Sequence, residues 1–147
     1  MAQYGRPSTD TYNADLYTDQ AGGSTNIYTT IDEVTASDAD YVRTVVGPTS
    51  DVYVTKLTNL EDPLSSTGHI YRFRYAKSAA GGAQVDLTCQ LRQGYVNEAS
   101  QGTLIHSEAL TNISETWTTT PITLTGPEAD AITAYTDLYI RALFNQV

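Results

Sequence analysis

The chain has few of the side chains that usually carry catalysis or cross-links. Its 147 residues include one cysteine, Cys89, and two histidines, His69 and His106. One cysteine excludes an intrachain disulfide, and Cys89 lies in the apolar row of a predicted strand, where a thiol acts as a small hydrophobic group. No serine lies in a nucleophile elbow, and the histidines lack the spacing of metal ligands on a helix. We therefore predict a protein that is not an enzyme and that uses no cofactor or metal.

Basic side chains are scarce as well. Eight Lys and Arg against 17 Asp and Glu give a formal net charge of −9, with lysines only at 56 and 77. Nucleic acids and anionic membranes attract positively charged surfaces, so neither is an expected partner. Seven of the acidic residues lie in residues 1–40, against Arg6 alone. This acidity is either a device for solubility or a means of docking on a basic partner.

Long hydrophobic runs and a secretory leader are missing too. No apolar run approaches the roughly 20 residues of a membrane span. The first residues, Met1 to Tyr4, lack the basic-then-apolar pattern of a signal peptide. We expect synthesis and first residence in a cytoplasm, and a chain of this length predicts a single domain.

Strand patterns, in contrast, are abundant. The most regular runs from Gln84 to Arg92, where Val85, Leu87, Cys89 and Leu91 alternate with polar residues. Successive side chains of a strand point to opposite faces, so this row is predicted to face a core. Before it, residues 69–76 carry the aromatic row of Tyr71, Phe73 and Tyr75, which lines either the core or, in part, a sugar-binding face, and the core is favoured because Phe73 has no polar tip. The small residues 78–82 join the two strands. Further strands are predicted at 27–31, 41–46, 51–57, 103–110, 117–124 and 137–144.

The spacing of these strands indicates the class of fold. Seven or eight short strands with turn residues between them predict an all-β chain folded as a single β-sandwich, either jelly-roll or immunoglobulin-like in topology. Pro121 places the 117–124 strand at an edge or a bulge, because proline cannot donate to a ladder. The last strand, 137–144, is expected to lie centrally. Thr125 and Glu128 have the spacing of a capping box, which predicts one short helix over about 127–133.

The first 26 residues show no strand or helix period, yet they are rich in tyrosine. Tyr4, Tyr12, Leu16 and Tyr17 are too apolar for an ordinary solvated tail. The segment is either a mobile terminus or an extended arm that becomes ordered on a neighbouring subunit. We therefore divide the chain into an extended N-terminal arm, 1–26, and a β-sandwich domain, 27–147.

Partner contacts are expected from this arm and from two arginines of the 69–76 strand. Arg72 and Arg74 share one face, where they either pair with Asp86 or Glu108 across the sheet or contact an acidic or carbonyl-rich partner surface. The candidate contact residues are Tyr4, Arg6, Tyr12, Leu16, Tyr17, Arg72 and Arg74. The carboxylates at 38 and 40 could face calcium, but the spacing of an EF-hand loop is absent.

Several stretches together resemble a known class of protein. They are Asp38-Ala39-Asp40-Tyr41-Val42, Tyr71-Arg72-Phe73-Arg74-Tyr75, Leu91-Arg92-Gln93-Gly94, Trp117-Thr118, and a closing run with Leu124-Thr125, Glu128 to Thr133, Tyr135 and Asp137 to Arg141. In this order, over about residues 27–144, they are similar to small structural proteins of tailed bacteriophages, among them the capsid decoration (cement) proteins.

This resemblance implies a virion protein on the capsid surface, with a β-sandwich that commonly forms a homotrimer. Such proteins sit where capsomers meet and reinforce the expanded head, so the implied partners are the major capsid protein and further copies of the chain itself. Residues 1–26 lie outside the resemblance, and it carries over no catalytic residue. The alternative function is a carbohydrate- or receptor-binding module of a phage tail fibre.

Overall fold

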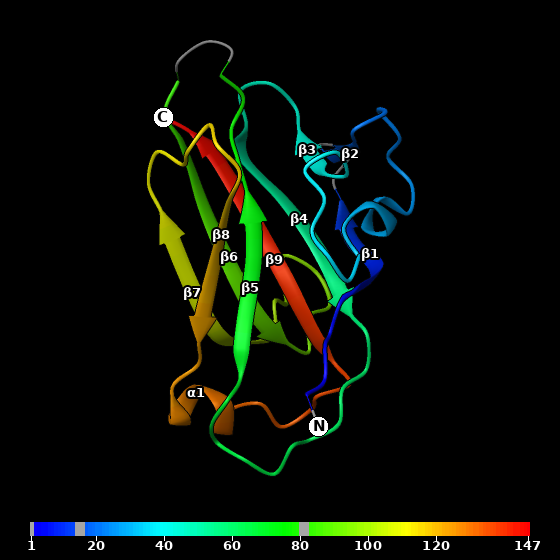
Figure 1. Cartoon of the computed structure of the whole chain (residues 1–147), viewed down its shortest axis with the longest axis vertical. Coiled ribbons are helices and arrows are strands. Elements are labelled where there is room, and N and C mark those ends of the chain that lie inside the picture. Colours follow the sequence, from blue (N-terminus) through cyan, green and yellow to red (C-terminus); the bar gives the residue numbers. More distant parts are fainter. Residues whose placement is uncertain (1, 14–16, 80–82) are drawn as a thin grey trace.

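The computed structural model describes residues 2–13, 17–79 and 83–147, which form a mostly β structure with short helical segments (Figure 1). Leu16 of the predicted arm and residues 80–82 of the predicted small-residue loop lie outside the described residues. The elements in chain order are β1 (Pro7–Asn13), β2 (Tyr17–Asp19), the 3-10 helix η1 (Ile27–Thr30), β3 (Val42–Thr44), β4 (Thr49–Leu57), β5 (Ile70–Tyr75), β6 (Val85–Gln93), β7 (Thr103–Leu110), β8 (Thr118–Thr123), α1 (Gly126–Asp130) and β9 (Leu138–Gln146).

A five-stranded antiparallel sheet is the centre of the molecule. Its strands follow the order β1-β4-β9-β6-β7, so β9 lies between β4 and β6, and its predicted central position is confirmed. Ile140 shows this placement, because it is paired with Thr55 of β4 on one side and Leu91 of β6 on the other. Alternation along these strands gives the sheet an inner face, to which Leu87 belongs, and an outer face, to which Arg141 belongs.

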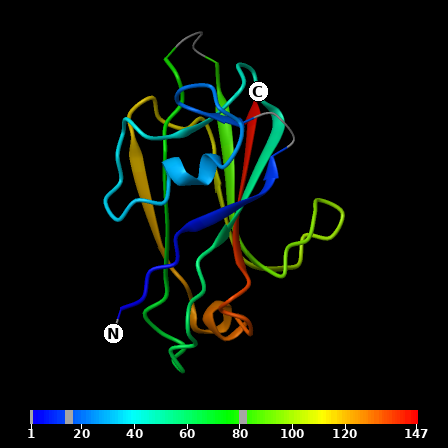
Figure 2. The same cartoon turned by 90° about the vertical axis from the view of Figure 1, so that its right-hand side faces the viewer.

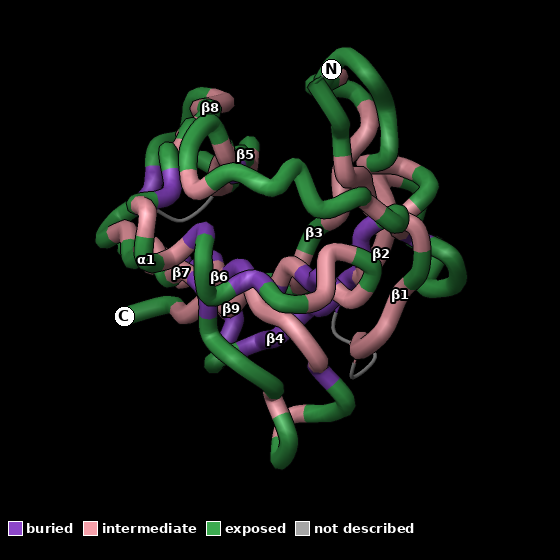
Figure 3. The backbone as a smooth tube through the Cα atoms, turned by 90° about the horizontal axis from the view of Figure 1, so that it is seen from below, coloured by how far each residue is buried: buried purple, intermediate pink, exposed green. Residues whose placement is uncertain are grey.

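Two small sheets lie over the inner face. One is the β5–β8 ribbon, defined as the antiparallel pair of those strands, and the other is the β2–β3 pair. Figure 3 shows them side by side above the five-stranded sheet, with β5 and β8 on one side and β2 and β3 on the other. Under the β5–β8 ribbon, Tyr71 packs with Leu87 and Cys89, and its hydroxyl donates to Cys89 Sγ at 2.6 Å. The predicted inward rows of β5 and β6 are thus confirmed.

A second cluster fills the space under β2 and β3. Tyr17, Ile27 and Tyr53 are all buried there, and the rings of Tyr17 and Tyr53 lie 5.5 Å apart. The outer face of the five-stranded sheet is covered differently, by the loop between β6 and β7. In Figure 2 this loop lies on the opposite side of the sheet from β5 and β8. Its Tyr95 packs against Tyr139 of β9.

The predicted strand at 27–31 is wrong, because Ile27–Thr30 is a 3-10 helix. The Asp10 carboxylate accepts hydrogen bonds from the backbone N–H groups of Ile27 and Tyr28, at 2.7 and 2.9 Å. Free N–H groups at the start of a helical turn need such an acceptor. The contact with Asp10 is remote in sequence, so local strand propensity could not reveal it.

The predicted arm also differs from expectation where the structure describes it. Pro7–Asn13 forms an edge strand on β4, and Tyr17–Asp19 pairs with β3. An edge strand such as β1 is held by its backbone ladder and needs no strict apolar period. Residues 7–13 and 17–19 are therefore parts of the folded β structure rather than a separate extended arm.

The remaining predicted elements are close to the observed ones. Pro121 lies in β8, which pairs with β5 alone among the described strands, so its predicted edge position is confirmed. The short helix α1 forms at the predicted capping box, where Glu128 Oε2 accepts the N–H and the hydroxyl of Thr125, both at 2.7 Å. It ends at Asp130 rather than near residue 133.

Candidate functional site

The main concave feature lies on the inner face, between the β5–β8 ribbon and the N-terminal third of the chain. We call it the cleft; it has a volume of about 510 Å³. Its floor comes from β4, β6 and β9, and one wall comes from β5. The apolar side chains of floor and wall are Tyr53, Leu57, Phe73, Tyr75, Leu87, Ile140, Ala142 and Phe144. In the part of the chain that the structure describes, the two small sheets are separate ladders, and the cleft is lined from both.

A group of polar and aromatic contacts bridges the mouth of the cleft. Arg74 of β5 donates from Nε to Asp38 Oδ1 at 2.7 Å, and its Nη2 lies 2.6 Å from the same oxygen. The Arg74 guanidinium lies over the Trp117 ring at 5.8 Å. That ring in turn contacts Tyr41, with centroids 5.7 Å apart. These contacts join the β5–β8 ribbon to the segment that precedes β3.

Charged side chains of both signs line the cleft. Of the eight basic residues of the chain, Arg6, Arg72 and Arg74 line it. Arg74 is paired with Asp38, whereas Arg72 is exposed and has no ion pair among the described residues. Glu33 and Asp40 belong to the same lining. The lining is therefore mixed in charge, and within the described part of the chain neither Arg6 nor Arg72 has an ion pair.

The structure brings together several of the predicted contact residues. Arg6, Tyr17, Arg72 and Arg74 all line the cleft. Tyr17, however, is 2 % exposed and donates its hydroxyl to the Asp51 carbonyl, so it is a core residue in this structure and not a free contact.

The other predicted contact residues lie elsewhere. Tyr4 is exposed, and its ring lies 5.8 Å from the Arg6 guanidinium carbon. Tyr12 packs on the outer face, and Leu16 lies outside the described residues. The alternative in which Arg72 and Arg74 pair with Asp86 or Glu108 is wrong. β5 is hydrogen-bonded to β8 and not to β6, which places those carboxylates in a different sheet.

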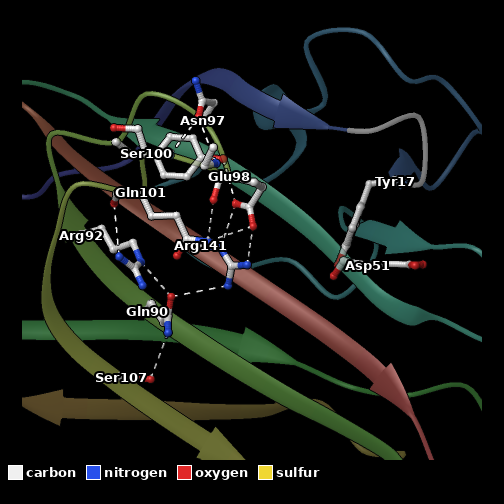
Figure 4. Close-up of polar contacts among 12 residues, drawn as sticks. Tyr17, Asp51, Gln90, Arg92, Asn97, Glu98, Ser100, Gln101, Ser107 and Arg141 are labelled. Carbon is white, nitrogen blue, oxygen red and sulfur yellow. Dashed lines mark hydrogen bonds and ion pairs between the residues drawn. The ribbon is translucent and has the colours of Figure 1, made fainter.

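A second polar cluster lies on the outer face, around Arg141 of β9 (Figure 4). Both carboxylate oxygens of Glu98 accept hydrogen bonds from this arginine. Oε1 accepts from Nε at 2.9 Å, and Oε2 accepts from Nη2 at 2.6 Å. Tyr95 donates its hydroxyl to Glu98 at 2.8 Å, and Gln90 accepts from Arg92 at 2.8 Å. Two parallel bonds from a guanidinium to a carboxylate form one of the strongest polar contacts in proteins.

The electrostatics of this cluster indicate a structural role. Arg141 is 6 % exposed, and its hydrogen bond to Glu98 raises the pKa of the arginine and lowers that of the glutamate. Each charge of the pair is compensated, which leaves no group poised for chemistry. The cluster holds the loop of Tyr95 and Glu98 onto the outer face. Sequence reasoning missed it, because nothing in the loop signals a contact with a strand about 40 residues away.

The two histidines are both held by polar partners. His106 Nδ1 lies 2.7 Å from Glu128 Oε1, while Glu108 lies 3.7 Å from Nε2. The bond from His106 is the main cause that lowers the pKa of Glu128 to about 2, followed by the bonds from Thr125. His69 Nε2 lies 2.8 Å from the Tyr135 hydroxyl. These contacts fix α1 and the loop that follows it onto the β5–β8 ribbon and β7.

Cys89 is chemically quiet in this setting. It is 2 % exposed, and burial raises the pKa of its thiol to about 12. Because the thiolate is the reactive form, a thiol with such a pKa is a poor nucleophile at neutral pH. The prediction that Cys89 serves as a buried hydrophobic group is consistent with its place between Tyr71 and Leu87 in the core.

Three further findings concern metal binding, membrane-spanning helices and similarity to known proteins. Among the described residues, no group of three or more His, Cys, Asp or Glu is placed to hold a metal ion. No helix in that part of the chain has the length and apolar character needed to cross a membrane. Comparison with protein-family models, with curated proteins and with solved structures finds no match.

Proposed function

We propose that this chain is a structural protein of a tailed bacteriophage, which binds the outer surface of assembled heads and stabilises the capsid. The observation that carries the proposal is the cleft, an apolar recess with arginines at its mouth and a sheet edge beside it. Such a surface suits contact with another protein better than it suits a reaction. The sequence resemblance over about residues 27–144 supports the same function.

In this proposal the two small sheets act as the second layer of a β-sandwich. Together they cover the inner face of the five-stranded sheet, as the facing layer of a sandwich does. The proposed protein acts on the virion surface as a homotrimer, with the major capsid protein and its own copies as partners. It needs no cofactor and performs no reaction.

Sedimentation with phage heads tests this function. Purified protein is mixed with expanded heads that lack it, and we expect it to pellet with them and to raise the temperature at which they break. Heads already saturated with the protein are the matched control and should take up none. Failure to pellet with unsaturated heads at micromolar concentration would remove the proposal.

A second candidate function is glycan binding by a tail-fibre module, and one observation favours it. Trp117 and Tyr41 contact each other at the mouth of the cleft. Aromatic rings with one apolar face and a polar edge are suited to amphipathic ligands. Under this function, added oligosaccharide raises the melting temperature by mass action, and Trp117→Ala abolishes the shift.

A further inference from the structure

The strand β5 has one edge without a partner strand among the described residues. It pairs only with β8, and its six residues, Ile70–Tyr75, leave the other edge toward the cleft. A free edge presents a row of backbone donors and acceptors, which makes it a template for pairing with another chain. In Figure 1 this edge faces the N-terminal third of the chain, with the five-stranded sheet behind it.

The phase of the β5–β8 ladder identifies which backbone groups point outward. Leu124 donates its N–H to the His69 carbonyl at 3.0 Å. In an antiparallel pair, bonded and non-bonded positions alternate. The register Arg72↔Pro121 then falls at a non-bonded position, and Pro121 agrees with this because it has no N–H to donate. The N–H and C=O groups of Arg72 and Arg74 therefore point away from β8, toward the free edge.

The cleft beside this edge has room for a strand. Its volume of about 510 Å³ is far above that of the voids found in a packed core, which rarely exceed a water molecule. A chain paired with β5 would direct every second side chain onto the floor. The half-buried apolar side chains of the floor are Ile140, Ala142 and Phe144. Apolar side chains at alternate positions of the added strand would cover these residues.

The charges at the edge indicate which side chains such a strand should carry at the positions that point away from the floor. Arg72 and Arg74 project from the face opposite the floor, where cross-strand neighbours of opposite charge are favourable. Arg72 has no ion pair among the described residues. Arg6 lies in the same lining, as do the carboxylates of Glu33 and Asp40. An added strand with carboxylates between its apolar residues would satisfy these cations.

We propose that an extended, acidic segment of a partner protein adds to the free edge of β5 as a strand, with its alternate apolar side chains in the cleft. Under the proposed function this segment belongs to the capsid protein, and that identity rests on the proposed function. Strand addition is a common mode of recognition, in which the backbone supplies affinity and the pockets supply specificity. On docking, a carboxylate of the segment takes over Arg74 from Asp38.

A synthetic peptide tests the edge without any capsid. The probe is a peptide of about eight residues, long enough to span β5, with alternating valine and aspartate. It is titrated into the full chain, and binding is followed by amide hydrogen exchange. We expect the amides of Arg72 and Arg74 to become protected. A peptide with lysine in place of aspartate is the matched probe and should bind weakly.

Five substitutions separate the contribution of charge from that of backbone pairing. Arg72→Glu should weaken binding of the acidic peptide roughly tenfold or more, while Arg43→Glu, an equal charge reversal on an exposed residue outside the cleft, should not. Arg72→Pro removes the backbone N–H of residue 72, which points toward the free edge. The Arg72→Pro variant should therefore bind the acidic peptide more weakly than the Arg72→Ala variant does. Asp38→Asn releases Arg74 and should strengthen binding.

Each contrary outcome has a defined meaning. Equal binding of the acidic and basic peptides, or protection outside β5, overturns the inference. Self-association that Arg72→Glu abolishes, without peptide binding, assigns the edge to a second copy and overturns it as well. Heads that bind wild type and Arg72→Glu alike refute the strand contact and leave the proposed function intact. Heads that bind neither refute the proposed function, and the peptide result then decides the inference alone.

Discussion

At the scale of single residues, two ion pairs of equal length lie in contrasting surroundings. Arg141 Nη2 and Glu98 Oε2 are 2.6 Å apart, as are Arg74 Nη2 and Asp38 Oδ1. The side chains of the first pair are 8 % and 27 % exposed, and those of the second are 30 % and 52 % exposed. Removal of one partner from a buried pair leaves an uncompensated charge, whereas water replaces the partner in an exposed pair.

We therefore expect Glu98→Ala to lower the free energy of unfolding by about 3 kcal/mol. The matched change Asp38→Ala should cost less than about 1 kcal/mol. Urea titration of both variants measures the difference. The double variant Glu98→Ala with Arg141→Met should recover most of the loss, because it removes the stranded charge. A double variant as unstable as Glu98→Ala would contradict this explanation.

The pH dependence of stability should show the contribution of Glu128. Its pKa is about 2 in the folded chain, mainly because His106 bonds to it, against 4.5 in the unfolded chain. As the pH falls from 4.5 towards 2, the unfolded chain binds this proton before the folded one does. The stabilisation by Glu128 is therefore fully present above pH 4.5 and is lost towards pH 2.

The measurement is urea unfolding of wild type and Glu128→Gln at a series of pH values. The stability difference between the two should shrink as the pH falls from 4.5 towards 2. Glu98 also has a lowered pKa, but it contributes equally to both proteins and cancels in the difference. If the stability difference between wild type and Glu128→Gln grew as the pH fell, the pKa of Glu128 would be raised in the folded chain rather than lowered.

The acidic residues near the N-terminus show what sequence could and could not foresee. They were expected to favour solubility or docking, and their count is plain in the sequence. In the structure, the Asp10 carboxylate accepts hydrogen bonds from two backbone N–H groups of η1 and from the hydroxyl of Tyr53. The Asp19 carboxylate accepts hydrogen bonds from the backbone N–H groups of Ala21 and Gly23. Composition reveals the charge but not these acceptor roles, since the donors are fixed by turns and by remote strands.

At the scale of elements, the alternation of apolar and polar residues along a single strand predicted which side chains face the core. It did not predict which strands pair with each other. The inward rows of β5 and β6 followed directly from the period of two. That β5 pairs with β8, and β6 with β7 and β9, depends on contacts between remote segments. The cleft arises from this pairing, so the sequence indicated its three arginines, Arg6, Arg72 and Arg74, but neither their shared recess nor the contact with Trp117.

The N-terminal strands should contribute to stability. Deletion of residues 1–26 removes β1 and the buried ring of Tyr17, so we expect a loss of at least about 3 kcal/mol, the usual cost of one buried aromatic side chain. Deletion of residues 2–6 alone is the control and should cost much less, because those residues are exposed or half-buried. Thermal unfolding followed by circular dichroism compares the two. If the deletion of residues 1–26 left the melting temperature unchanged, residues 1–26 would be an arm independent of the folded domain.

At the scale of the whole molecule, the proposed trimer makes a direct prediction. Sedimentation equilibrium at micromolar concentration should give three times the chain mass of 16.0 kDa. If the trimer forms only on the head, the free protein will sediment as a single chain and pellet with heads in multiples of three per site. A stable dimer would contradict both forms of the proposal.

The central place of β9 has a consequence for how the protein is made. Nothing in the five-stranded sheet joins the β1–β4 half to the β6–β7 half except this strand, which is residues 138–146. A nascent chain emerging from the ribosome therefore lacks the strand that joins the two half-sheets until residues 138–146 clear the exit tunnel. Assembly of the sheet is thus confined to the moments after synthesis of that segment, when both halves still expose apolar faces to other newly made chains.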